Sequence, residues 1–289
     1  MVTVPPLFRS LIDDAAVFPP GDLPLKLAVP AHHDHRRAWY AGLVGPLLCP
    51  SSALGTLEEL VRDDRPLDVG VVVDTGTAGV LEAVDVVAQT EHLTLRGVEV
   101  PLRGEPLAES ARRTVTALDT ALGGPDDDEP GYVEVPRAPG WQAALDVIAD
   151  SGYRAKLRTG GADPSAYPST AELAAFVIGC LDRGIAFKLT AGLHHAVRHS
   201  TTAGQVEHGF LNVVNAVATA LDGGDQDVVA ATLGVTDADV VVAAVTSLTA
   251  ERAASVRRWF TSYGACSITE PLADVVELGL MTEPDDVAP

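Results

Sequence analysis

The feature that most constrains this chain is a repeated alternation of short β-branched runs with longer helical patterns along its 289 residues. Such alternation is typical of βαβ units that build a parallel sheet. No G-x-G-x-x-G follows the first run, and eight units in a chain of this length therefore favour a (β/α)₈ TIM barrel over a doubly wound sheet. The candidate strands are at residues 10–15, 43–49, 69–74, 95–101, 131–136, 153–158, 185–190 and 264–268.

We expect one barrel domain over residues 1–289, with two departures from a minimal barrel. The first is a Pro-rich connection, 19–30, which precedes His32, His33 and His35 in an expected loop. The second is a stretch of about seventy residues between strands seven and eight, which predicts extra helices near 207–221 and 226–245. Helical patterns occur at 55–64, 77–90, 105–122, 138–150, 169–182, 204–222 and 249–261.

Charge and hydropathy exclude several classes of protein. The chain has 20 Lys and Arg against 40 Asp and Glu, a net charge of −20, which disfavours nucleic acid and anionic membranes as partners. No signal peptide or membrane-spanning run is recognisable, so we expect a cytoplasmic location. Three cysteines without close spacing indicate neither a disulfide framework nor a zinc cage. The apolar helices at 211–221 and 240–246 fit either barrel packing or a homo-oligomer face.

Ionisable residues occur within or at the ends of several apolar strands. Active sites of such barrels lie at the carboxyl ends of the strands, where these groups would gather. An ionisable side chain inside an apolar strand is costly unless it is paired or functional, and outward-facing or purely structural ion pairs are the competing interpretation. The residues concerned are Asp74, Glu99, Glu134, Lys156 and Lys188.

The two strand lysines stand out because the chain uses 17 Arg and only three Lys, the third being Lys26. Arginine stays protonated, whereas a buried lysine can lose its proton and act as a nucleophile. Two ammonium groups on adjacent strands would also depress each other's pKa. We therefore predict that Lys156 is a Schiff-base nucleophile and that Lys188 lowers its pKa.

Four ordered segments together resemble deoxyribose-phosphate aldolase, a class I aldolase family. They are LIDDAAVFPP (11–20), KLRTGG (156–161), FKLTAGL (187–193) and YGACSI (263–268). The resemblance implies a Schiff base on Lys156, tuning by Lys188, and proton transfer by Asp13 with Glu99 as a positional counterpart of the family's fourth-strand aspartate. Glu134 is our further candidate for proton transfer. The resemblance covers about a tenth of the chain, and Leu157-Arg158 and His194-His195 depart from the family pattern.

The substrate expected from this interpretation is a small carbonyl compound bearing a phosphate or carboxylate, with no cofactor and no metal. Residues 131–200 carry seven basic and six acidic groups in an otherwise acidic chain, which is consistent with an anion pocket. The expected substrate-binding residues are Arg158, Thr159, Gly160, Gly192, His194, His195, Arg198, Gly264 and Ser267.

Two other functions remain open from the sequence. A metal-dependent lyase or hydrolase would use histidines such as His194, His195, His199 and His208 together with Glu99 and Glu134. A barrel without catalysis would serve as a binding or regulatory subunit. Cys266 is a candidate nucleophile, but a small buried packing residue is the more ordinary interpretation.

Overall fold

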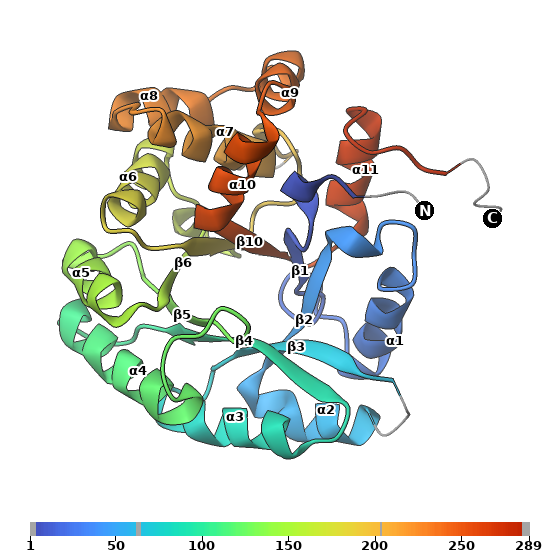
Figure 1. The fold of residues 1–289 in the computed structure, drawn as a ribbon, viewed down its shortest axis with the longest axis vertical. Helices are drawn as coiled ribbons and strands as arrows, with labels where there is room; N and C mark the ends of the chain where they lie inside the picture. The colour runs from blue at the N-terminus through green and yellow to red at the C-terminus, as the bar shows by residue number, and fades with distance from the viewer. Residues whose placement is uncertain (1–3, 62–64, 203, 285–289) are drawn as a thin grey trace.

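A closed barrel of eight parallel strands forms the centre of the molecule (Figure 1). The computed structural model describes residues 4–61, 65–202 and 204–284. Around the barrel the strand order is β1, β2, β3, β4, β5, β6, β7 and β10, and β10 pairs back with β1. The prediction of a (β/α)₈ TIM barrel is confirmed. The strands are β1 (Ile12–Asp14), β2 (Val44–Pro50), β3 (Leu67–Val72), β4 (Leu93–Pro101), β5 (Gly131–Glu134), β6 (Arg154–Arg158), β7 (Phe187–Thr190) and β10 (Phe260–Ala265).

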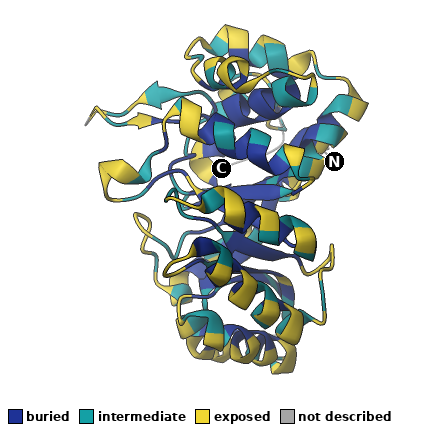
Figure 2. Ribbon diagram, turned by 90° about the vertical axis from the view of Figure 1, so that its left-hand side faces the viewer, coloured by how far each residue is buried: buried dark blue, intermediate teal, exposed yellow. Residues whose placement is uncertain are grey.

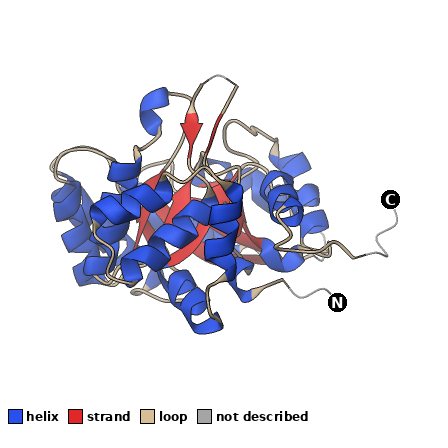
Figure 3. Ribbon diagram, turned by 90° about the horizontal axis from the view of Figure 1, so that it is seen from above, coloured by secondary structure: helices blue, strands red, loops and turns tan. Residues whose placement is uncertain are grey.

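Helices surround the strands, as Figure 3 shows from above. The helices that flank the strands present an apolar face to the sheet; in the helix over Leu107–Leu122, for example, Ala111 and Leu118 are fully buried. Figure 2 shows buried residues on the strands and on the helix faces that cover them. The helices are α1 (Leu25–His35), α2 (Leu54–Leu60), α3 (Val80–Gln89), α4 (Leu107–Leu122), α5 (Trp141–Ser151), α6 (Thr170–Asp182), α7 (Phe210–Leu221), α8 (Gln226–Leu233), α9 (Ala238–Thr246), α10 (Ala250–Trp259) and α11 (Thr269–Glu277).

The first connection is shorter than predicted, because α1 begins at Leu25 inside the Pro-rich stretch. His32, His33 and His35 therefore lie in a helix, and the prediction of a loop there is wrong. His32 is buried, with its Nδ1 2.9 Å from Asp14 Oδ2, so this histidine ties α1 to the end of β1.

The last barrel strand begins earlier than predicted. It runs over Phe260–Ala265 rather than 264–268, because Thr261 and Ser262 interrupt the apolar run that marks a strand in the sequence. Phe260 and Tyr263 are fully buried in this strand. Ser262 is also buried, and this places a hydroxyl inside the barrel.

The insertion between β7 and β10 contains the predicted extra helices, α7, α8 and α9. Its first part is not helical: β8 (His199–Ser200) and β9 (Val206–Glu207) form a small antiparallel hairpin, which projects from one end of the barrel in Figure 3. In the part of the chain that the structure describes, no single helix has the length and apolarity to cross a membrane; α8 and α9 meet that test only as a pair bent by 119°.

Candidate active site

Five ionisable side chains from five strands meet inside the barrel. Lys156 Nζ lies 2.5 Å from Glu99 Oε2 and 2.8 Å from Glu134 Oε2. Lys188 Nζ lies 2.5 Å from Glu99 Oε1 and also forms an ion pair with Asp13. Glu99 thus bridges the two lysines, and we call these five residues the lysine–carboxylate network.

The strand pattern explains why these groups meet. Lys156 is in register with Glu134 on β5 and with Lys188 on β7. Successive residues of a strand point to opposite faces, so the neighbours of Lys156 in β6, Ala155 and Leu157, pack with the hydrophobic core. Both lysines are only 2% exposed. Buried charges of this kind require the pairing that is observed here.

The pKa of Lys156 differs from the sequence-based expectation. Burial lowers this pKa, and Lys188 lowers it further, but the carboxylates of Glu134 and Glu99 outweigh both and raise it above its ordinary value. For Lys188, burial is likewise outweighed by Asp13 and Glu99, and its pKa is raised. The expected net depression of the Lys156 pKa by Lys188 is therefore wrong for this structure, and both lysines are ammonium groups at neutral pH.

The carboxylates of the network have different proton affinities. The pKa of Glu99 is lowered to about 2, because Lys156 and Lys188 together outweigh the effect of burial. The pKa of Glu134 is also lowered, against its burial, by Lys156 and Arg158. For Asp13 burial dominates over Lys188 and raises the pKa. The hydroxyl of Ser262 donates a hydrogen bond to Asp13 Oδ2 at 2.7 Å.

A cavity of about 460 Å³ opens at the carboxyl ends of the strands, where the barrel fold places active sites. We call it the mouth cavity. Lys156 lines it, whereas Lys188 lines a smaller cavity at the amino-terminal ends of the strands. Of the predicted substrate-binding residues, the mouth cavity is lined by Arg158, Gly192, His194 and Gly264.

Thr159 and Gly160 have structural positions beside the mouth cavity instead of lining it. The buried Thr159 hydroxyl donates to the Ala191 carbonyl at 2.5 Å. At Gly160 a Cβ would lie 2.7 Å from the Gly192 backbone, and Gly192 itself has φ +70°. These residues let the loops after β6 and β7 approach each other closely.

The remaining predicted polar residues make local contacts outside the cavity lining. His195 Nδ1 lies 3.2 Å from Asp274 Oδ2, and the Arg198 guanidinium donates to His208 Nδ1 at 3.0 Å. Ser267 Oγ accepts a hydrogen bond from the backbone of Glu270 at the start of α11. These contacts hold the insertion and α11 in place.

Among the residues that the structure describes, His194 is the one histidine that lines the mouth cavity. Its Nδ1 lies 3.1 Å from Glu270 Oε2 and 3.8 Å from Cys266 Sγ. Cys266 and Glu270 raise the pKa of His194 to about 9, although burial opposes them, so the imidazole is cationic at neutral pH. Cys266 is only partly buried and lines the same cavity, so the interpretation of it as a buried packing residue is wrong.

The histidines do not converge as the metal-dependent alternative requires. His208 is buried, its Nε2 lies 2.8 Å from the Pro168 carbonyl, and burial lowers its pKa to about 4. Glu99 and Glu134 are engaged by the lysines. Among the residues that the structure describes, no three His, Cys, Asp or Glu side chains are grouped so as to hold a metal ion.

Sequence reasoning did not single out several residues that line the mouth cavity. Phe18, Pro19 and Pro20 come from the connection after β1, Tyr167 from the connection after β6, and Glu207 from the hairpin strand β9. The segment 11–20 was noted for its resemblance, but the role of its last three residues depends on how the loop folds back over the barrel. Tyr167 carried no signal in the sequence, whereas Glu207 stands next to His208, in the pair that follows the histidine-rich segment 192–199.

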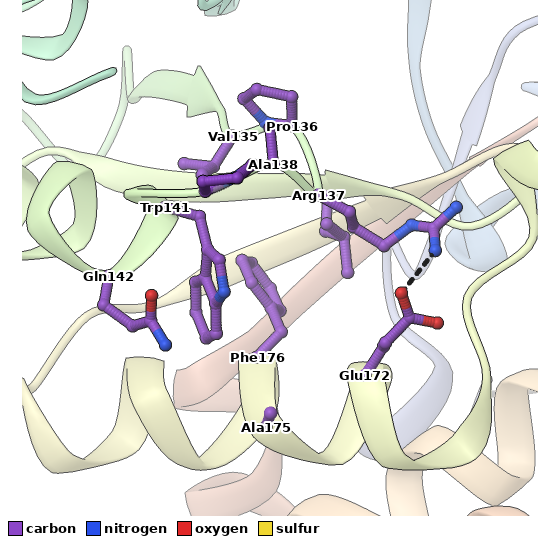
Figure 4. Close-up of a pocket in the computed structure, with 11 residues that line it drawn as sticks. Val135, Pro136, Arg137, Ala138, Trp141, Gln142, Glu172, Ala175 and Phe176 are labelled. Carbon is purple, nitrogen blue, oxygen red and sulfur yellow. Dashed lines mark hydrogen bonds and ion pairs between the residues drawn. The ribbon is translucent and has the colours of Figure 1, made fainter. Parts of the chain in front are cut away.

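A second cavity of about 330 Å³ lies outside the barrel, between the β5–α5 connection and α6 (Figure 4). Trp141 and Phe176 form much of its wall. Its charged lining groups, Arg137 and Glu172, pair with each other at 2.8 Å. This cavity offers apolar contact and no nucleophile in its lining, so the mouth cavity is the candidate active site.

No family model matches the sequence, and no curated protein matches it. The fold and the arrangement of side chains are therefore the basis for proposing a function.

Proposed function

We propose that this protein is a class I aldolase-like lyase in which Lys156 forms a Schiff base with a small carbonyl compound. The observation that carries the proposal is the position of Lys156, which lines the mouth cavity and contacts two carboxylates. A nucleophilic lysine needs access to the bound substrate and a partner that accepts its proton, and Lys156 lines the mouth cavity beside Glu134. The ordered motifs that resemble deoxyribose-phosphate aldolase support the same assignment.

The proposed reaction begins with transfer of a proton from the Lys156 ammonium to Glu134, whose pKa rises when a bound anion draws Arg158 away from it. The free amine adds to the substrate carbonyl carbon, and the resulting carbinolamine loses water to form an iminium ion. A carboxylate then removes the proton of the β-hydroxyl, the C–C bond breaks, and its electron pair moves into the iminium to form an enamine. Protonation of the enamine carbon and hydrolysis of the iminium release the second product and restore the amine.

The mouth cavity offers cations for an anionic group on the substrate. Arg158 lines it with a half-exposed side chain, and the cationic His194 lines it from the loop after β7. Arg158 also contacts Glu134 at 3.3 Å, so a bound phosphate or carboxylate would compete with Glu134 for this guanidinium. Competition of this kind links substrate binding to the carboxylate that accepts the Lys156 proton.

The direct test is reduction with borohydride in the presence of short aldehydes, ketones, keto acids and sugar phosphates, followed by intact mass and peptide mapping. We expect a stable adduct on Lys156 and none on the exposed Lys26. The chain has only three lysines, so mapping distinguishes Lys156 from Lys188 and from the amino terminus. An adduct on Lys188 alone, or none across the panel, would contradict the proposal.

Glu134→Gln is expected to shift the pH dependence of this trapping to lower pH. The pKa of Lys156 is raised above its ordinary value, so the free amine and the trapping rate increase with pH, about tenfold per unit below the pKa. Glu134 is the larger of the two carboxylate contributions that raise this pKa, and its neutral amide would remove that effect. The rate of adduct formation between pH 6 and 10 measures the shift. Glu59→Gln, on the exposed surface of α2, is the control, and identical profiles for all three proteins would show that Glu134 does not control Lys156.

A further inference from the structure

The smaller cavity that Lys188 lines has basic walls and lies at the opposite end of the barrel from the mouth cavity. It has a volume of about 190 Å³ and is formed by residues at the amino-terminal ends of the strands. Three guanidinium groups and the Lys188 ammonium line it, together with hydroxyl-bearing side chains that can donate hydrogen bonds. The lining donors are Arg96, Arg154, Arg257, Lys188, Ser10, Tyr132, Thr261 and Ser262.

Arg257 provides a positive charge without an acidic partner in this cavity. Its guanidinium donates to the carbonyls of Phe260 and Arg9, both at 3.0 Å. Within the described residues no carboxylate lies within 4 Å of it, although every other arginine lining this cavity has one. Burial lowers the pKa of Arg257 to about 10, although Asp13 opposes this effect, which reflects the cost of burying the guanidinium without a carboxylate in contact.

Arg154 and Arg96 stand at the solvent side of the same cavity. Arg154 contacts Asp127, whose side chain is fully exposed, and donates to the Tyr132 hydroxyl at 3.3 Å. Arg96 donates to Asp68 at 2.8 Å, with 44% of its side chain exposed. The Arg96 side chain is partly exposed, and exposed ion pairs contribute little stability and exchange readily, so its guanidinium can turn to a bound ligand. Arg154 is less exposed, but its partner Asp127 lies in solvent and can be replaced by a ligand.

The arginine-rich lining of this cavity favours an anion. Its lining has four cations, Arg96, Arg154, Arg257 and Lys188, and two carboxylates, Asp13 and Glu99. Both carboxylates are already bound by lysines of the network. Asp68 and Asp127 pair in turn with Arg96 and Arg154, so among the described residues Arg257 is the lining cation that has no carboxylate within 4 Å, and arginine forks suit tetrahedral oxyanions in particular.

We propose that this cavity is a binding site for a phosphate dianion, either free inorganic phosphate or the phosphate of a small monoester. The guanidinium groups of Arg96, Arg154 and Arg257 would hold its oxygens, with Ser10 as a neutral donor. The site lies at the end of the barrel remote from the mouth cavity and does not depend on the proposed lyase reaction.

The test is ³¹P NMR titration of the full-length protein with inorganic phosphate and with phenyl phosphate, at ionic strength held constant with NaCl. We expect Arg154→Gln and Arg96→Gln each to weaken phosphate binding at least tenfold. Arg112→Gln, on the exposed face of α4, should leave this binding unchanged, and Arg158→Gln reports separately on any phosphate bound in the mouth cavity. A comparison of the two probes shows whether the cavity takes free phosphate alone or a monoester as well.

Arg257 itself is tested with Arg257→Lys. A neutral replacement would remove the hydrogen bonds to the Phe260 and Arg9 carbonyls and could prevent folding. This variant keeps the charge but loses the fork, and we expect weaker phosphate binding with an unchanged urea unfolding midpoint. Binding that is lost only in Arg158→Gln would place phosphate in the mouth cavity and overturn the proposal. No binding by the wild-type protein beyond the chloride control would also overturn it.

Discussion

Replacement of Lys156 by arginine is expected to reduce the cleavage rate on the order of 10⁴-fold or more, with no loss of the folded barrel. Arginine keeps the positive charge that Glu99 and Glu134 require, so the ion pairs can be retained. It cannot lose its proton to form an amine, and the Schiff base is therefore excluded. The rate of C–C cleavage of the substrate identified by borohydride trapping measures the effect.

The matched control is Lys26→Arg, which makes the same change on the exposed surface of α1 and should leave the rate unaltered. Far-ultraviolet circular dichroism and the urea midpoint check that both variants are folded. A Lys156→Arg variant that retains full activity would contradict the Schiff-base mechanism, and it would favour the metal-dependent alternative.

Glu99→Ala is expected to destabilise the protein by about 3–5 kcal/mol, because it leaves two buried ammonium groups without the carboxylate that joins them. For a chain of this size, that loss corresponds to a fall in Tm of roughly 6–20 °C. Urea unfolding at pH 7 measures the change in the free energy of unfolding. Glu59→Ala on α2 removes an exposed carboxylate and should change it by less than about 0.5 kcal/mol.

The effect of Glu99→Ala should also depend on pH. The pKa of Glu99 is about 2 in the folded protein, below its ordinary value of 4.5, so the unfolded chain binds its proton first as the pH falls. The stability that Glu99 contributes is therefore complete above pH 4.5 and decreases as the pH falls from there towards 2. The difference in the free energy of unfolding between wild type and Glu99→Ala should therefore decrease over this range. A difference in the free energy of unfolding that stays constant would show that Glu99 does not stabilise the fold through its charge.

The periodic pattern of the sequence was sufficient to predict the barrel, because buried parallel strands and amphipathic helices have different hydrophobic periods. It failed where that signal is interrupted. The polar residues Thr261 and Ser262 interrupt the apolar pattern in the first half of β10, so the predicted strand began too late. Prolines interrupt the helical pattern near the start of α1, so no helix was predicted there. Strand β9 of the small hairpin lies within the segment 204–222 that predicted a helix, since such short strands leave almost no periodic signal.

The inward position of the five network residues follows from their placement in strands, but their mutual distances do not. Barrel closure brings β1 and β4 to Lys188 from distant parts of the chain, and this is what places Glu99 between the lysines. The direction of the Lys156 pKa shift depends on those distances, so the lysine pair alone gave the wrong sign. Thr159 and Gly160 were assigned to the substrate because a motif cannot distinguish a loop that binds a ligand from one that braces its neighbour.

The division of the mouth cavity between strands and connections has an evolutionary consequence. The groups that would move protons are fixed by the barrel strands, whereas Tyr167 and Glu207 at the rim belong to the β6–α6 connection and to the insertion after β7. Surface connections tolerate insertion and exchange far better than barrel strands do. Lineages that carry this barrel can therefore diversify the molecules they admit by remodelling the segments 161–167 and 191–208, while they inherit the lysine–carboxylate network unchanged.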